Sequence, residues 1–134
     1  MNGNNDFGVS FSRISWIDKA IQDHPNVTST TRSEDIFFTV TRERGDEVRL
    51  VCLDEYACGI TRVREVLAAF PTANLIYVGG NWNGYTTEAK QFCLEGQLGL
   101  FNSSEITGAL YRDDFWGYHK HDDEGNPLYP FNNQ

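Results

Sequence analysis

The chain has 134 residues, 40% of them apolar and 13% aromatic, which predicts one globular domain over residues 1–134 and excludes a disordered or fibrous protein. Its formal net charge of −8 repels a phosphate backbone at long range, so it disfavours duplex DNA as a partner and favours a basic protein surface. No segment approaches the ~20 apolar residues of a membrane helix, and residues 1–6 lack the basic and apolar regions of a signal peptide, so we expect a cytoplasmic protein without membrane contact.

The first half of the chain predicts one helix followed by three short strands. Three isoleucines recur at helical spacing within residues 12–23, which predicts a helix there. Residues 27–31 are rich in β-branched side chains but only weakly apolar, as expected of a short strand near a sheet edge. Apolar residues then alternate over residues 36–40 and 48–52, and the glycine turn between these runs predicts an antiparallel hairpin.

The next segment predicts a crossover from this hairpin to a parallel strand. Apolar side chains fall on one face of a helix over residues 60–70, which follows Gly59 and ends before Pro71. Residues 75–78 are apolar on both faces, as in a buried strand that runs parallel to its neighbour. Strand, helix and strand in this order carry the chain across the sheet, which makes the fold α/β.

The remaining residues predict two more helices and a strand, followed by an aromatic tail. Thr86 can cap a helix, residues 98–101 predict a strand, and residues 106–110 predict a short helix. We therefore expect a single α/β domain with a mixed central sheet and flanking helices, whose core spans about residues 12–111. The tail over residues 112–134 is expected to pack back on this core through Phe115, Trp116, Tyr118, Tyr129 and Phe131.

The order of helix, three meandering strands, crossover helix and parallel strand resembles the αβββαβ core of the restriction endonuclease-like, or PD-(D/E)xK, superfamily. The strand pair that looks like the catalytic pair of those nucleases runs from Ser33-Glu34-Asp35-Ile36 to Leu50-Val51-Cys52-Leu53. The segments Tyr85-Thr86-Thr87-Glu88-Ala89-Lys90, Leu98-Gly99-Leu100-Phe101 and Glu105-Ile106 look like the helix, strand and short helix that follow the core in the branch that includes enzymes restricting methylated DNA. The resemblance covers about residues 12–111 and implies the same α/β fold.

Carried over by position, the resemblance implies that the cutting site has been lost. Asp35 matches the metal-binding aspartate, but Val51 and Leu53 stand where the second carboxylate or glutamine and the lysine belong. Carboxylates hold magnesium against the scissile phosphate and a nearby cation helps to generate hydroxide, and apolar side chains do neither. A shifted register would bring Asp54 and Glu55 to Asp35 as a displaced Mg²⁺ site; the other interpretation is that they mark the solvated end of the strand.

The loop over residues 79–86 leaves the carboxyl end of the predicted parallel strand, where open α/β sheets place their binding sites. Its side chains Trp82, Asn83 and Tyr85 are the candidate binding residues, because aromatic groups anchor protein interfaces. The alternative is structural: Trp82 and Tyr85 close the end of the core, while Asn81 and Asn83 hydrogen-bond the turn.

These observations predict a non-catalytic nuclease-fold protein of bacterial or phage type, which acts by protein–protein interaction and inhibits or regulates a nucleic-acid-handling enzyme. This interpretation needs no catalytic residue, metal ligand or cofactor. Two alternatives stay open, namely a magnesium-dependent nuclease that uses Asp35, Asp54 and Glu55, and a structural subunit of a larger nuclease assembly. The sequence also leaves a homo-oligomer open.

Overall fold

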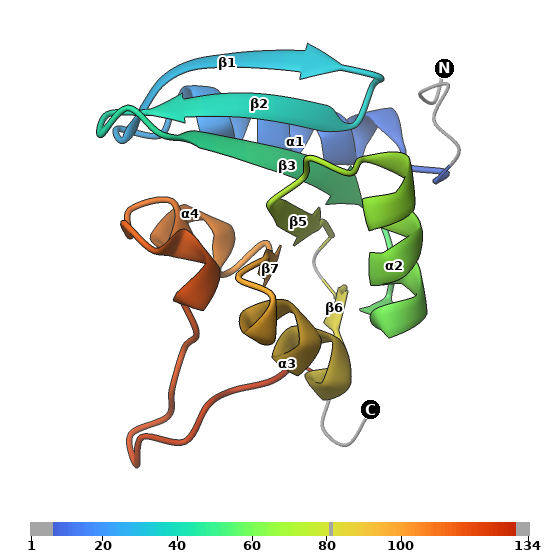
Figure 1. Cartoon of the computed structure of the whole chain (residues 1–134), viewed down its shortest axis with the longest axis vertical. Coiled ribbons are helices and arrows are strands. Elements are labelled where there is room, and N and C mark those ends of the chain that lie inside the picture. Colours follow the sequence, from blue (N-terminus) through green and yellow to red (C-terminus); the bar gives the residue numbers. More distant parts are fainter. Residues whose placement is uncertain (1–6, 81, 131–134) are drawn as a thin grey trace.

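The computed structural model describes residues 7–80 and 82–130. Within these residues the chain forms a five-stranded mixed sheet, a second sheet of two short strands, and four α-helices (Figure 1). The predicted α/β class with a mixed sheet is therefore confirmed. None of the helices in this part of the chain is long and apolar enough to cross a membrane.

The N-terminal half forms the antiparallel part of the large sheet. Helix α1 spans Phe11–Gln22 and is followed by the strands β1 (Val27–Ser33), β2 (Phe37–Arg42) and β3 (Glu47–Leu53). The strands pair in the predicted meander, β1 with β2 and β2 with β3, both antiparallel. β1 continues two residues beyond the predicted range of 27–31, because its polar, exposed last residues still pair with β2.

A crossover then adds the parallel part of the sheet. Helix α2 (Ile60–Ala69) leads to β5 (Leu75–Val78), and helix α3 (Thr87–Glu95) leads to β7 (Gly99–Asn102). β5 pairs parallel with β3 and β7 pairs parallel with β5, so the strand order is β1-β2-β3-β5-β7. β3 therefore lies at the centre of the sheet, and its last four residues are buried on both faces.

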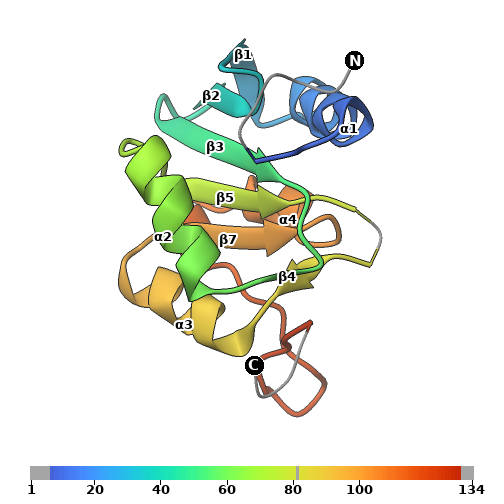
Figure 2. The same cartoon turned by 90° about the vertical axis from the view of Figure 1, so that its right-hand side faces the viewer.

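Helices cover the sheet on both sides. Figure 2 shows α1 on one side and α2 and α3 on the other. The apolar stripe of α1 is completely buried at Ile14, Ile17 and Ile21, and α2 buries Val63 and Val66. These two layers hold the sheet from both faces and leave its strand ends and edges for other contacts.

Two very short strands in the loops after β3 and β5 are not predicted by the sequence. They are β4 (Ala57–Cys58) and β6 (Gly84–Tyr85), which pair parallel with each other. Two residues are too few to show the alternation by which a strand is recognised in a sequence.

The described part of the chain beyond β7 packs on the core. Helix α4 (Ile106–Ala109) is followed by a 3₁₀ turn, η1 (Phe115–Gly117). Phe115 is buried, and Trp116, Tyr118 and Tyr129 pack against the core. Phe131, which was expected to join them, lies outside the described residues.

Candidate functional site

The carboxyl ends of β3 and β5 are neighbours, and the two loops that leave them form one surface. β4 in the first loop pairs with β6 in the second, Ala57 with Gly84 and Cys58 with Tyr85. The Gly84 amide also donates to the carbonyl of Tyr56 at 3.0 Å. These backbone hydrogen bonds hold residues 56–58 of the first loop beside residues 84–86 of the second.

Val51 and Leu53 are completely inside the core. Val51 pairs with Phe37 of β2 on one side and with Ile76 of β5 on the other, so it belongs to the centre of the sheet. The strand thus presents hydrocarbon at the two positions where the resemblance would place groups that activate water.

The structure does not bring together the three carboxylates of the alternative magnesium site. Each is paired with a different arginine: Asp35 with Arg32 at 2.9 Å, Asp54 with Arg13 at 3.4 Å, and Glu55 with Arg62 at 3.2 Å. Among residues 7–80 and 82–130, no three histidine, cysteine, aspartate or glutamate side chains form a group that could hold a metal ion.

Asn83 fixes the shape of the loop after β5. Its side-chain nitrogen donates to Asp54 Oδ1 at 2.8 Å and to the carbonyl of Gly79 at 2.6 Å. Gly80 has a left-handed φ of 108°, and a Cβ added there would lie 2.8 Å from the same nitrogen, so only glycine suits this position. Asn83 therefore holds the turn, as the structural alternative predicted, while Asn81 lies outside the described residues.

Trp82 and Tyr56 are the exposed aromatic side chains of this surface, and we call them the aromatic pair. The Trp82 side chain is 84% exposed and that of Tyr56 is 66% exposed. The sequence analysis missed Tyr56, although a large aromatic residue directly after Asp54 and Glu55, where the strand ends, is a usable signal. The aromatic pair brings one ring from each of the two joined loops.

The prediction that Tyr85 contributes to a contact surface is wrong. Its side chain is completely buried, and its hydroxyl donates to Glu105 Oε2 at 2.6 Å. The pairing of β6 with β4 holds this residue inside the core, so Tyr85 closes the end of the core as the structural alternative predicted. Burial, together with the nearby charge of Glu105, raises the pKa of Tyr85, so its hydroxyl remains a hydrogen-bond donor.

A second buried polar group lies close to Tyr85, and the sequence analysis did not identify it. Lys90 on α3 is only 1% exposed, and its Nζ donates to the carbonyl of Leu100 at 2.7 Å and to that of Tyr118 at 3.4 Å. The same Nζ lies 5.2 Å from the centre of the Tyr85 ring. Lys90 therefore binds backbone carbonyls of β7 and the tail.

Burial lowers the pKa of Lys90 to about 8, while the charge of Glu105 acts in the opposite direction. The signal for its burial was present in the sequence, since Lys90 precedes the buried Cys93 by three residues and so shares its face of α3.

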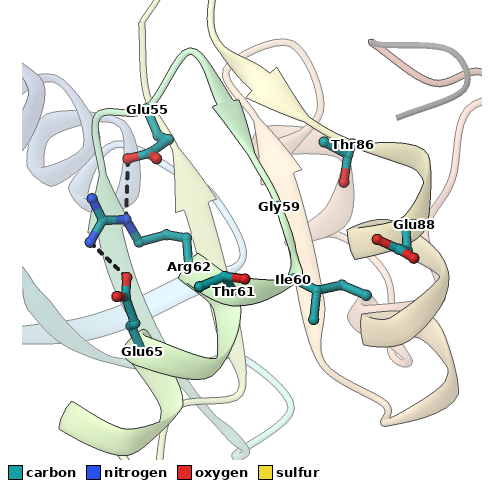
Figure 3. A pocket seen from close by; sticks show the side chains of 8 residues that line it. All are labelled: Glu55, Gly59, Ile60, Thr61, Arg62, Glu65, Thr86 and Glu88. Carbon is teal, nitrogen blue, oxygen red and sulfur yellow. Dashed lines mark hydrogen bonds and ion pairs between the residues drawn. The ribbon is translucent and has the colours of Figure 1, made fainter.

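A cleft of about 410 Å³ lies between the N-terminal ends of α2 and α3 (Figure 3). Its lining consists of Glu55, Gly59, Ile60, Thr61, Arg62, Glu65, Thr86 and Glu88. Arg62 pairs with Glu55 at 3.2 Å and with Glu65 at 3.0 Å, and Figure 3 shows Glu88 on the opposite side, on α3. Three glutamates against one arginine make the lining acidic, so the cleft suits a cationic group better than a phosphate.

No family model, no curated protein and no solved structure matches the chain.

Proposed function

We propose that this chain is a catalytically degenerate restriction endonuclease-like protein that acts by binding another protein, a nucleic-acid-handling enzyme which it inhibits or regulates. The strand order supports this, since β1, β2 and β3 form a meander and β5 runs parallel to β3 after a crossover helix. The burial of Val51 and Leu53 supports the absence of cutting, because hydrocarbon cannot hold magnesium or activate water.

The observation that carries the proposal is the aromatic pair, Trp82 and Tyr56, exposed on two loops that backbone hydrogen bonds hold together. Large aromatic side chains on a fixed support are the usual anchors of protein interfaces, and removal of one such anchor costs about 2 kcal/mol or more of binding free energy.

The charge of the chain indicates the kind of partner. Enzymes that handle nucleic acids carry basic surfaces that bind phosphates. A protein of net charge −8, with an acidic cleft that contains Glu55 beside Tyr56, is attracted to such a surface and competes there with the nucleic acid. Occupation of the phosphate-binding surface is the physical basis of the inhibition that we propose.

The binding test uses two exposed aromatic residues at opposite ends of β3. Proteins recovered on the immobilised chain are identified, and the Kd of each purified candidate is measured for the wild-type chain and for the variants Trp82→Ala and Tyr111→Ala. Tyr111 is also exposed, but it lies near the amino end of β3, where Arg42 binds the carbonyls of Leu110 and Arg112. We expect Trp82→Ala to raise the Kd at least about tenfold and Tyr111→Ala to leave it unchanged.

The same preparations test the inhibition and its alternative. The wild-type chain should lower the activity of the recovered enzyme on nucleic acid, and Trp82→Ala should not. Magnesium-dependent cleavage of DNA or RNA by the purified chain, abolished in Asp35→Ala, would overturn the proposal in favour of a nuclease with a displaced site.

A further inference from the structure

The two edge strands of the five-stranded sheet, β1 and β7, differ in whether their outward-facing backbone groups have hydrogen-bond partners. At β7, side chains satisfy the backbone groups that face away from β5: the Leu100 carbonyl accepts from Lys90 Nζ at 2.7 Å, and the Asn102 amide donates to Glu105 Oε1 at 3.0 Å. Lys90 and Glu105 are themselves buried. A further strand could join β7 only by displacing these two side chains, so this edge is closed.

The direction of the backbone groups in β1 follows from the hydrogen bonds between β2 and β3. The Cys52 amide donates to the Ile36 carbonyl at 2.9 Å, and the Arg42 amide donates to the Asp46 carbonyl at 3.0 Å. In an antiparallel pair, such hydrogen-bonded residues alternate along the strand. The even-numbered residues of β2 therefore bond to β3, and its odd-numbered residues bond to β1.

The register of β1 then leaves an unpaired row at the outer edge. The residues of β1 opposite the odd-numbered residues of β2 are Ser29, Thr31 and Ser33. The amides and carbonyls of Thr30 and Arg32, between them, must point away from the sheet. In Figure 1, β1 lies at the border of the sheet with no other described strand beyond it.

β1 also contains no lysine, no proline and no inward charge, which usually protect such an edge, and no described strand lies beyond it. Its only charged side chain, Arg32, is paired with Asp35 at 2.9 Å. A register shift between Val27 and Ser29 distorts only the start of the strand. From Ser29 to Ser33 the strand remains regular, rich in hydroxyl side chains and almost neutral.

We propose that β1 pairs antiparallel with β1 of a second copy of this chain across a two-fold axis, so that two five-stranded sheets become one continuous sheet. The strand is complementary to itself. Across such a pair, the threonine and serine side chains of the two copies face one another, and Arg32 does not face the same arginine of the other copy. An isologous contact of this kind uses both open edges and closes the assembly as a dimer. This inference is independent of the proposed function, because the binding surface proposed there lies around Trp82, in the loop after β5, and does not include β1.

The first test measures the size of the full chain and the exchange of two amides. We expect sedimentation equilibrium to give twice the monomer mass of 15.2 kDa at high concentration, with dissociation on dilution. We also expect the Thr30 and Arg32 amides, followed by NMR, to exchange with solvent more slowly as the protein concentration rises. Neither amide has a partner in β2, so only a new contact at the edge explains such protection.

Two variants, each with a matched control, assign the dimer to β1. Thr30→Pro removes an outward amide without touching the bonds to β2, and should weaken the dimer about tenfold. Thr30→Val is its matched control, because it keeps the backbone amide and removes only the Thr30 hydroxyl, which is buried without a hydrogen-bond partner. This variant should remain a dimer. Thr31→Lys places two like charges near the two-fold axis, so this variant should be a monomer at low salt and a dimer at high salt. Its control is Thr72→Lys, which adds the same charge at an exposed position outside β1 and should leave the dimer unchanged.

A chain that sediments as a monomer at every concentration, with Thr30 and Arg32 amides that exchange at one constant rate, would overturn the inference. So would a dimer that Thr30→Pro and Thr31→Lys leave equally stable, since that dimer would use another surface.

Discussion

Lys90 connects the edge strand β7 with the tail. Its ammonium group lies between the carbonyls of Leu100 and Tyr118, so it joins β7 to the tail. Burial of this charge is unfavourable, and the lowered pKa of about 8 measures part of that cost. The charge-assisted hydrogen bonds to both carbonyls offset the remainder.

The titration of Lys90 predicts a pH dependence of stability that the variant Lys90→Met should lack. An unperturbed lysine has a pKa of 10.5, so between pH 8 and 10.5 the unfolded chain binds more protons than the folded one. Lys90 therefore makes the free energy of unfolding rise with pH across this window; its burial cost is present in full below pH 8 and disappears above pH 10.5. In urea unfolding, the wild-type value minus the Lys90→Met value should increase by about 1 to 3 kcal/mol between these limits.

The comparison with Lys90→Met is needed because other groups make the free energy of unfolding fall, and not rise, with increasing pH. Burial raises the pKa of the Cys52, Cys58 and Cys93 thiols to about 12, so each of them lowers stability as the pH rises above 9. Both proteins contain these thiols, and their contribution largely cancels in the difference. A difference that stays flat with pH would show that Lys90 keeps an ordinary pKa.

The hairpin of β1 and β2 turns through residues 34–36, and two of these have a conformation that side chains disfavour. Glu34 has φ of 47° and Asp35 has φ of 72°, both in the left-handed region that glycine adopts most readily. Asp35 is held by Arg32, whereas Glu34 is exposed. The pairing of six positions of β1 with β2 is enough to impose this turn on unfavourable residues.

Substitution of Glu34 should therefore change stability according to backbone preference alone. Glu34→Gly should raise the free energy of unfolding by about 0.5 to 1 kcal/mol, because glycine adopts this conformation freely. Glu34→Val should lower it by about 1 kcal/mol or more, since a β-branched residue is strongly disfavoured there. Urea unfolding of both variants checks the prediction, and equal stability of the two would contradict it.

For the whole molecule, the elements with clear periodicity could be predicted and the local contacts of the site could not. The isoleucines of α1 and the run of β5 show their periods directly, so the meander and crossover followed from the sequence. The orientation of Tyr85 depends on β4, which lies almost thirty residues earlier in the chain and has no period of its own. The spacing to Cys93 places Lys90 on the buried face of α3, but it does not reveal the carbonyls of β7 and the tail to which Lys90 donates, because these lie in later parts of the chain.

The placement of β3 at the centre of the sheet has a consequence for synthesis of the chain on the ribosome. The N-terminal half emerges first and can form the meander. Until residues 75–78 are made, however, the apolar strand β3 has no neighbour on the side where it later pairs with β5. Such an edge recruits other nascent chains. A fragment that ends at Phe70 should therefore aggregate when expressed, as centrifugation of the lysate will show, whereas the full chain stays in the supernatant; a monomeric fragment would mean that the half-sheet protects itself.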